Sequence, residues 1–191
     1  MTTRIVHAVI GLLVLGLTNP CAAGDTLPPN VTARYTMQVG GITAGHTTWT
    51  ITRADNGNVT YTSRSEPVAP YSWIRSDVIE RTSTLTDIAG ELIPQHYRYT
   101  RTKGKRDRHV DVTFKWAASQ ALMDVDGQKS TAGVTTGTMD PLSYLLRVMR
   151  DVAKGDTVFE YPVAGKGRVE TYNLVLEKFE ELDSAVGKRT V

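Results

Sequence analysis

Three of the four histidines lie outside an apolar opening run and could bind a metal or move a proton. His46, His96 and His109 fall in separate segments, without the short spacing that places two ligands on one element. A zinc site needs three or four ligands, so the fold would have to add carboxylates. We expect ordinary histidines on strand faces and no metal ion. A histidine–acid pair assembled only in three dimensions would be needed for a hydrolase.

Nucleophilic side chains give no stronger signal. The chain has no Gly-x-Ser-x-Gly turn, the motif that exposes the serine of many hydrolases, and its single cysteine is Cys21. Gly165-Lys166-Gly167 is too short for a phosphate-binding loop and is typical of a hairpin turn. We therefore predict no catalytic residue, no cofactor and no enzymatic activity.

Six cations gather on both sides of Gly104, where two strands should turn. They are Arg98, Arg101, Lys103, Lys105, Arg106 and Arg108. One interpretation is a contact for phosphate, a lipid headgroup or an acidic partner, because clustered guanidinium groups bind such oxygens. The other is a solvated tip whose charges discourage edge pairing, and the sequence leaves both open. A second charged group consists of Arg75, Asp77, Glu80 and Arg81, and on a strand Asp77 and Arg81 share a face while Glu80 takes the other. We expect a salt-bridge ladder on the surface, because charges on the concave face would have to pair at a cost.

Most of the chain after residue 30 alternates apolar and polar residues with period two, the pattern of strands wetted on one face. Threonine-rich polar faces also favour the pleated backbone. We predict strands over residues 32–39, 47–53, 59–66, 76–85, 92–101, 108–116, 121–125, 157–163 and 168–177. Turns are expected at Gly40-Gly41 and at Asp55-Asn56-Gly57-Asn58, since Gly and Asn tolerate positive φ.

One amphipathic helix is predicted, with Asp140 as N-cap, Pro141 at the first helical position and Gly155 at the C-terminal stop. Its apolar stripe should face the sheet and its charged residues should face water, the latter being Arg147, Arg150, Asp151 and Lys154. One helix cannot cover the inner face of so many strands. We therefore predict a mainly β fold, in which an antiparallel sheet curls into a barrel or half-barrel with the helix packed against it.

The side chains expected on the inner face are bulky and carry no reactive group. They are Tyr35, Met37, Trp49, Ile51, Phe114, Trp116 and Leu146. Trp73, in a loop with Tyr71 and Ile74, is either an apolar lip over a cavity or packed onto the end of the barrel. We predict that this set lines a cavity for a lipid, an acyl chain or a hydrophobic peptide.

The first residues have the three-part layout of a secretory signal peptide. Arg4 supplies a positive start, an apolar run follows, and Cys21-Ala22-Ala23 offers small residues for cleavage. The run is too short to span a bilayer, so we expect cleavage after Ala23 rather than an anchor. Lipidation of Cys21 is the alternative, and Pro20 before it argues against that reaction. A mature chain without cysteine, in an oxidising compartment, must rely on its packed core.

We expect residues 1–23 to be the signal peptide, 24–30 a linker and 31–191 a single β-rich domain in the periplasm. No later run is apolar enough to cross a membrane, so the mature chain should have no transmembrane segment. The net charge of +2 gives no general attraction to nucleic acid. The last four residues look like a strand that stops as it starts, so we expect an incomplete C-terminus.

Several stretches resemble one bacterial family. They are Ala33-Arg34-Tyr35, Gly41–Gly45, Tyr61–Pro67, Tyr97-Arg98-Tyr99, Gly104–Arg108, Asp140–Tyr144 and Tyr161–Ala164. In this order they resemble the periplasmic family catalogued as domain of unknown function 3108. The resemblance implies an envelope location and a β-rich fold, and it transfers no activity and no catalytic residue. Members run on past the last residue of this chain, which supports the expected truncation.

Two functions from different classes follow. The leading hypothesis is a non-enzymatic periplasmic protein that binds or carries an apolar ligand. The alternative is a structural or interaction module for envelope assembly, with a filled core and the basic hairpin as its contact. Its partner would then be another envelope protein.

Overall fold

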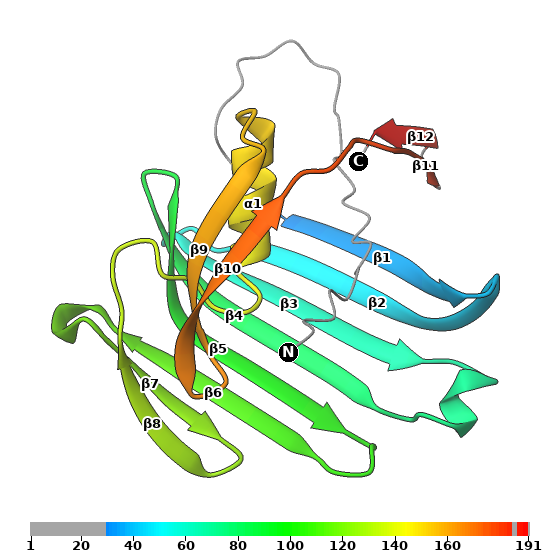
Figure 1. Cartoon of the computed structure of the whole chain (residues 1–191), viewed down its shortest axis with the longest axis horizontal. Helices are drawn as coiled ribbons and strands as arrows, with labels where there is room; N and C mark the ends of the chain where they lie inside the picture. The colour runs from blue at the N-terminus through cyan, green and yellow to red at the C-terminus, as the bar shows by residue number, and fades with distance from the viewer. Residues whose placement is uncertain (1–29, 185–186, 191) are drawn as a thin grey trace, which may run out of the picture.

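The computed structural model describes residues 30–184 and 187–190, and the expected signal peptide lies outside them. Eight antiparallel strands form one sheet in chain order (Figure 1). They are β1 (Asn30–Val39), β2 (Ile42–Arg53), β3 (Asn58–Pro67), β4 (Val78–Ile88), β5 (Glu91–Thr102), β6 (Arg108–Lys115), β7 (Gln120–Val125) and β8 (Gln128–Gly133). The sheet is curved and not closed, with β1 and β8 as its edges. The predicted half-barrel is confirmed.

The first two turns lie where the sequence predicts them. Gly40 and Gly41 join β1 to β2 with positive φ angles of 58° and 79°. Between β2 and β3, Gly57 has a φ of 80° and donates its N–H to the carbonyl of Ala54 at 3.0 Å. Residues with a Cβ rarely adopt these angles, so the glycines set the positions of the turns.

Two strand assignments in the eight-stranded sheet were incomplete, and the short strand over Glu181–Ser184 outside that sheet was not predicted. β2 begins at Ile42 rather than at Thr47, because its first residues pair with β1 although Ala44 and Gly45 interrupt the apolar alternation. β8 was not predicted at all, since its residues are polar or small and show no alternation of bulky apolar side chains. It forms as an edge strand on β7, where one face needs little burial.

The helix α1 (Tyr144–Ala153) lies in the concavity of the sheet (Figure 1). It begins later than predicted, with Ser143 at the N-cap position. Asp140 still supplies the capping bonds, because its Oδ1 accepts from the N–H groups of Leu142 at 2.8 Å and Ser143 at 2.9 Å. The carboxylate therefore stabilises the turn that leads into the helix rather than its first turn.

A hairpin of β9 (Val158–Gly165) and β10 (Arg168–Val175) covers the other side of α1 (Figure 1). The hairpin turn predicted at Gly165-Lys166-Gly167 is confirmed, and Lys166 and Gly167 form it with φ angles of 50° and 86°. The turn is fixed to the sheet, since Ser130 Oγ donates to the carbonyl of Gly167 at 3.0 Å. β11 (Glu181–Ser184) and β12 (Gly187–Thr190) form a further short hairpin.

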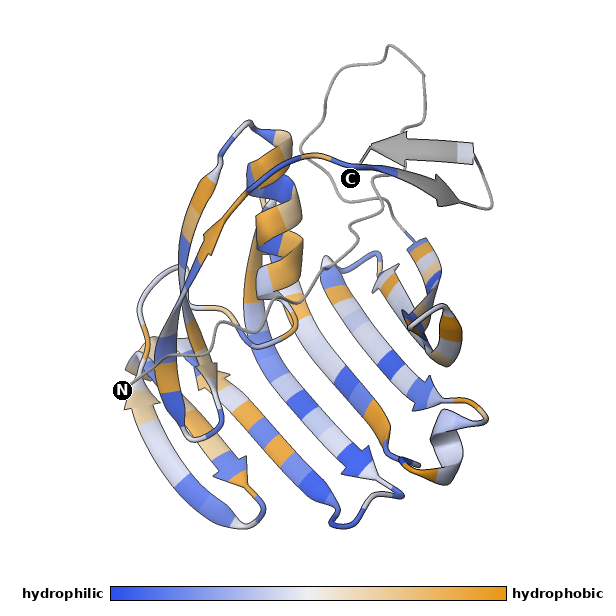
Figure 2. Ribbon diagram, turned by 45° about the vertical axis from the view of Figure 1, so that its right-hand side comes forward, coloured by the Kyte–Doolittle hydropathy of each residue, from blue (hydrophilic) through white to orange (hydrophobic). Residues whose placement is uncertain are grey.

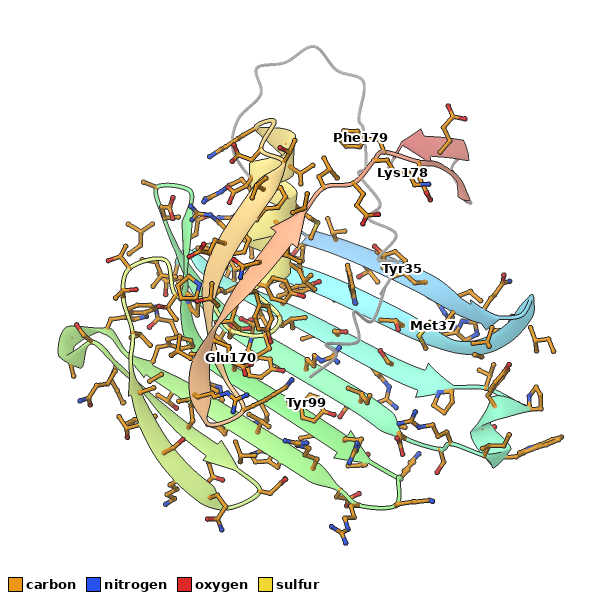
Figure 3. All side chains as sticks on the ribbon, in the orientation of Figure 1. Tyr35, Met37, Tyr99, Glu170, Lys178 and Phe179 are labelled. Carbon is orange, nitrogen blue, oxygen red and sulfur yellow. The ribbon has the colours of Figure 1, made fainter. Side chains whose placement is uncertain are left out.

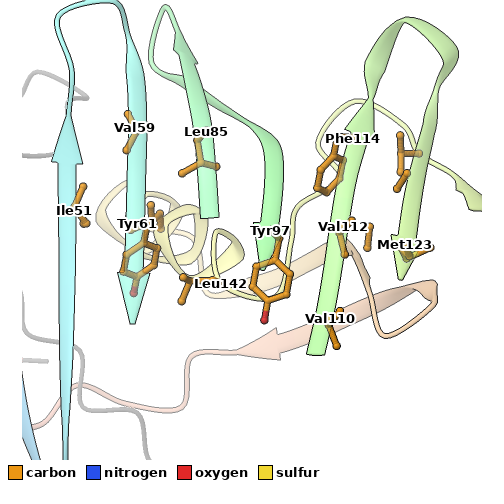
Figure 4. Packing of buried hydrophobic residues seen from close by; sticks show 14 residues of the cluster. Ile51, Val59, Tyr61, Leu85, Tyr97, Val110, Val112, Phe114, Met123 and Leu142 are labelled. Carbon is orange, nitrogen blue, oxygen red and sulfur yellow. The ribbon is translucent and has the colours of Figure 1, made fainter. Parts of the chain in front are cut away.

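The helix is apolar on two sides, and each side packs on a different cluster. Leu146, together with Leu142 just before the helix, joins the large cluster on the concave face of the sheet, which Figure 4 shows from close by. Its other buried members include Val59, Tyr61, Leu85, Tyr97, Val112, Phe114 and Met123. On the hairpin side, Val148 and Val152 pack against a cluster built on Phe159, Tyr161 and Val163. The helix is thus held between two layers.

The prediction that Asp151 faces water was wrong, because the hairpin covers that side of the helix. Asp151 is 9% exposed and accepts a hydrogen bond from Tyr161 OH at 2.8 Å. It also pairs with Arg147, whose Nε lies 3.0 Å from its Oδ2. Burial alone would raise the pKa of Asp151, but these bonds outweigh it and hold the pKa below its usual value.

Candidate functional site

A pocket of about 480 Å³ lies between the concave face of the sheet, the start of α1 and the β9–β10 turn. Its size falls within the range of small-molecule sites. Aromatic and aliphatic side chains make up most of the wall, among them Trp49, Tyr97, Tyr99, Tyr144, Leu145 and Tyr172. The polar part of the lining consists of Ser63, Arg81, Arg108 and Lys166.

The pocket lies where the concave face changes character along the strands. On β3 the inward positions pass from Val59 and Tyr61, both fully buried, to Ser63. On the neighbouring β4 they pass from Leu85 to Arg81. Figure 2 shows these central strands as orange only in part, with long polar stretches away from the helix. The helix covers the apolar half, and the pocket opens beside it.

Arg81 is the central cation of the pocket. On the sheet it lies opposite Ser63 of β3 and Tyr99 of β5, and its guanidinium carbon is 5.7 Å from the centre of the Tyr99 ring. Burial raises the pKa of Tyr97 well above that of a free phenol, and the nearby charge of Arg81 opposes this rise. Among the described residues, no carboxylate forms an ion pair with Arg81.

Two further arginines share the concave face with Arg81. Arg101 on β5 and Arg108 on β6 lie directly opposite each other in the sheet register. Arg101 donates to the carbonyl of Arg106 at 3.3 Å, while its buried Nε has no partner within the described part of the chain. Arg108 has a distant partner, since its Nε lies 3.8 Å from Asp126 Oδ2.

Two buried hydroxyl groups next to Arg81 are also unsatisfied. Ser63 is 2% exposed and Tyr61 is fully buried, and neither side-chain oxygen has a hydrogen-bond partner among the residues described. Such a group costs on the order of 1–3 kcal/mol in a protein interior unless it finds a partner. Ser63 lines the pocket, so a bound molecule could supply that partner.

Asp140 lies close to the pocket but is occupied by the fold. It is fully buried, and Ser83 Oγ donates to its Oδ2 at 2.5 Å in addition to the two backbone bonds. Burial raises the pKa of Asp140, and these hydrogen bonds offset the rise only in part. Its oxygens are thus used to hold the start of the helix against β4.

The predicted cavity residues do not lie together. Of them, only Trp49 lines the pocket, and Tyr35 packs against it with ring centres 4.9 Å apart. Three are buried in the filled core, namely Ile51, Phe114 and Leu146. Trp116 stacks on Phe114 at 5.3 Å and donates its ring N–H to the Pro94 carbonyl at 2.7 Å.

Two members of that set point to solvent, which corrects their assignment to a cavity. Met37, at the free edge of the sheet, is 41% exposed, and Trp73 is 82% exposed. Figure 3 labels Tyr35 and Met37 on the edge strand β1 and Tyr99 on β5, nearer the hairpin. Inward alternation on an edge strand does not ensure burial, because the end of β1 extends beyond the part of the described sheet that α1 and the β9–β10 hairpin cover.

The basic run is divided between the two faces of the sheet. Arg98 lies on the outer face, where its Nε is 3.5 Å from Asp111. Three of the cations are exposed at the β5–β6 turn, namely Lys103, Lys105 and Arg106. Arg101 and Arg108 belong to the inner face, and Arg108 lines the pocket. The six cations, although close in the sequence, therefore do not form one basic patch on the surface.

Sequence reasoning missed the pocket residues Arg81, Lys166, Tyr144 and Tyr172. Arg81 was expected in a surface ladder, with the concave face as the alternative, and the structure places it on the concave face while Glu80, on the opposite face, pairs with Arg64. The signal was available, because strict alternation from the buried Leu85 places Arg81 on the same inner face. Lys166 and Tyr172 come from the hairpin, whose position over the sheet no local pattern specified.

The histidines do not contribute to the pocket. His96 lies 2.9 Å from Asp111 on the outer face, and His46 contacts Thr36 at 3.4 Å on the edge of the sheet. Within residues 30–184 and 187–190, no group of three metal-binding side chains is close enough to hold an ion. No described helix is both long and apolar enough to cross a bilayer.

Exposed apolar side chains and cations lie at the same end of the sheet, the end with the β1–β2 and β5–β6 turns. Trp73 and Ile74 are 82% and 85% exposed, and Tyr71 OH donates to the carbonyl of Val39 at the β1–β2 tip at 3.4 Å. On its other side the same loop reaches the basic turn, since Ser76 Oγ donates to the carbonyl of Lys103. We call this surface the rim, consisting of Val39, Ile42, Trp73, Ile74, Lys103, Lys105 and Arg106.

A family model described as "Protein of unknown function (DUF3108)" matches residues 34–191. The chain belongs to the DUF3108 family. The resemblance noted from the sequence is confirmed, and most of the DUF3108 chain is included in the match. No curated protein matches it.

Among solved structures, this DUF3108 protein is similar to a beta-barrel-like protein of domain of unknown function DUF1849 from Brucella abortus. The TM-score is 0.42 at 10% sequence identity, with 73% of this chain and 60% of that chain covered. The chain thus spans about three-fifths of the length of that protein. A likeness at this level carries no information on activity.

Proposed function

We propose that this protein binds an apolar ligand, such as an acyl chain, in the pocket between the sheet and α1. It acts as a carrier or binding protein and not as an enzyme. The observation that carries the proposal is the open pocket of about 480 Å³ walled by aromatic and aliphatic side chains. Burial of a hydrocarbon chain there gains roughly 0.8 kcal/mol per CH₂ group.

Export to the periplasm is part of this proposal. Its support is the N-terminal sequence, in which Arg4, an apolar run and Cys21-Ala22-Ala23 follow one another. N-terminal sequencing of protein from a periplasmic extract should begin at Gly24. A chain that keeps residue 1, or that fractionates with the cytoplasm, would contradict export.

Filling the pocket tests the binding proposal. Leu145 lines it, so Leu145→Trp should occupy the volume in which a chain would lie. We expect the neutral apolar probe phenylnaphthylamine to bind the purified protein saturably, and Leu145→Trp to remove that binding. Val175→Trp is the control, because Val175 is 68% exposed on β10 and does not line the pocket.

Unchanged probe binding by folded Leu145→Trp protein would end the pocket proposal. Circular dichroism of each variant establishes that the β fold is intact. Native mass spectrometry of gently purified protein gives an independent answer, since a carrier should retain a hydrophobic molecule that Leu145→Trp lacks.

The rim favours a second function, docking onto an anionic lipid bilayer. Trp73 and Ile74 extend into solvent on the same rim as three cations. The β5–β6 turn that carries these cations packs against the loop before β4, because a Cβ on Gly104 would collide with the carboxylate of Asp77. Aromatic residues favour the membrane–water interface, and each nearby Lys or Arg adds about 1 kcal/mol of attraction to an anionic leaflet. The rim would then be the contact of an envelope module.

Vesicle flotation tests this second function. Wild-type protein should float with phosphatidylglycerol vesicles and not with phosphatidylcholine vesicles, and Trp73→Ser with Ile74→Ser should abolish flotation. Val158→Ser is the control, because Val158 is 71% exposed on β9, outside the rim. Equal capture of the double variant, or a dimer that the same substitutions dissociate, would overturn membrane docking.

A further inference from the structure

Three arginines point from consecutive strands toward the concave side of the sheet. Arg81 lies on β4, Arg101 on β5 and Arg108 on β6, and the last two are direct cross-strand partners. Like charges at directly opposed positions destabilise an antiparallel pair. The described lining of the pocket includes no Asp or Glu to compensate them. Such an arrangement persists most easily where an anion completes it.

The donors in this region are not satisfied by the protein. Within the described chain, Arg81 has only the face of Tyr99 as a partner, and Arg101 has a buried Nε without an acceptor. Ser63 is 2% exposed, lines the pocket, and has no partner for its hydroxyl group within that part of the chain. Buried donors without acceptors are uncommon in folded proteins and point to an absent ligand.

The nearest buried acid cannot serve as the counter-ion. Asp140 is fully buried, and its oxygens already accept hydrogen bonds from Ser83, Leu142 and Ser143. Asp126 is about half exposed and lies 3.8 Å from Arg108, too far for a strong hydrogen bond. Lys166 adds a further cation from the β9–β10 turn on the opposite wall.

We infer that the polar lining of the pocket, formed by Ser63, Arg81, Arg108 and Lys166, binds the oxyanion headgroup of an amphipathic ligand. Arg101 does not line the pocket and adds only its charge beside Arg108. The ligand class is a hydrocarbon chain that ends in a carboxylate or a phosphate. Guanidinium groups bind both oxyanions with paired, charge-assisted hydrogen bonds. The chain lies against Trp49, Leu142 and Leu145 of the same pocket. The inference therefore rests on the proposed function and names the substrate class.

Isothermal titration of the purified protein with three ligands of equal chain length tests it. Dodecanoate and dodecyl phosphate should bind roughly tenfold or more tightly than dodecanol, because each charge-assisted hydrogen bond contributes at least that factor. Arg81→Gln should remove this preference while the affinity for dodecanol changes less than about twofold. Whichever of the two anions binds more tightly identifies the headgroup.

The control is Arg98→Gln, which removes a guanidinium from the outer face of β5 and should leave all three affinities unchanged. Lys166→Gln, at an exposed turn, is a second variant that leaves the core intact, and it should weaken both anions about threefold. Raising the salt concentration should weaken the anions and not dodecanol.

Equal affinity for dodecanoate and dodecanol, unaffected by Arg81→Gln, would overturn the headgroup site and leave the apolar pocket standing. Failure of all three ligands to bind would instead overturn the proposed function, and this inference with it.

Discussion

The concave face of the sheet consists of two regions built on the same strands, one filled and one open. Under α1, fully buried side chains such as Val59, Leu85 and Leu146 pack in one hydrophobic cluster. A few residues further along the same strands, the inward positions are Ser63 and Arg81, and a pocket remains. The helix covers only the apolar region, so the residue types at the inward positions and the cover of α1 together decide which part of the curved sheet packs and which part stays available for a ligand.

Truncating two adjacent leucines of the helix sharpens this contrast most. Leu146 is fully buried in the filled region, and Leu146→Ala should destabilise the protein by about 3–4 kcal/mol, since it leaves a cavity that cannot collapse. Leu145 borders the pocket, so Leu145→Ala should cost only about 1–2 kcal/mol. Urea denaturation measures both. Equal losses would mean that the pocket region is as tightly packed as the core.

Removing the carboxylate at the boundary of the two regions should have the next largest effect. Asp140→Ala leaves the hydroxyl of Ser83 and the N–H groups of Leu142 and Ser143 without their acceptor. We expect a loss of about 2–3 kcal/mol in the free energy of unfolding. Asp107→Ala, at an exposed turn, is the control and should be neutral. A neutral Asp140→Ala would show that the start of α1 is fixed by packing alone.

The pH dependence of stability should differ in sign between two buried acids. The pKa of Asp151 is lowered in the fold, so its contribution is present above the unfolded pKa and is lost as pH falls through the folded value. The pKa of Asp140 is raised by burial, so its contribution is present at low pH and is lost as pH rises through the folded value.

Acid titration of the substituted proteins measures this difference. When the pH is lowered from neutral to acid, the free energy of unfolding should fall less in Asp151→Asn than in the wild-type protein. It should fall more in Asp140→Asn. If the free energy of unfolding fell equally with acidification in the wild-type, Asp151→Asn and Asp140→Asn proteins, the opposite pKa shifts assigned to the two acids would be contradicted.

The smallest expected effect comes from the pocket cations. Arg108→Gln relieves the opposition of Arg101 and Arg108 and should stabilise the ligand-free protein by about 0.5 kcal/mol. Arg98→Gln, which breaks the pair with Asp111 on the outer face, should be neutral or slightly destabilising. Thermal unfolding at low salt compares the two. A loss of stability in Arg108→Gln would mean that this residue serves the fold rather than a ligand.

The fold was largely predictable because its signals are local. Period-two alternation, the Asn-Gly turn and the Gly165–Gly167 turn located most strands, and the shortage of helix implied a curled sheet. The polar strand β8 and the first half of β2 were not predictable in this way, since pairing with a neighbour formed them. The burial of Asp151 depended on where the β9–β10 hairpin packs, which the helix pattern cannot show.

The site was less predictable, for a physical reason. Bulky inward residues were taken as cavity walls, yet Ile51 and Phe114 fill the core because large side chains close space. The pocket lies instead where Ser63 and Arg81 interrupt the apolar pattern. Polar residues at inward positions would have been the better signal. The opposite wall, including Lys166, required the three-dimensional position of the hairpin.

Crystals of the protein grown with a brominated dodecanoate test the central claim most directly, because anomalous scattering locates the chain without ambiguity. We predict bromine in the pocket near Leu142 and the carboxylate within hydrogen-bonding distance of Arg81. Bromine that lies only on the rim beside Trp73, with the pocket filled by water, would contradict it.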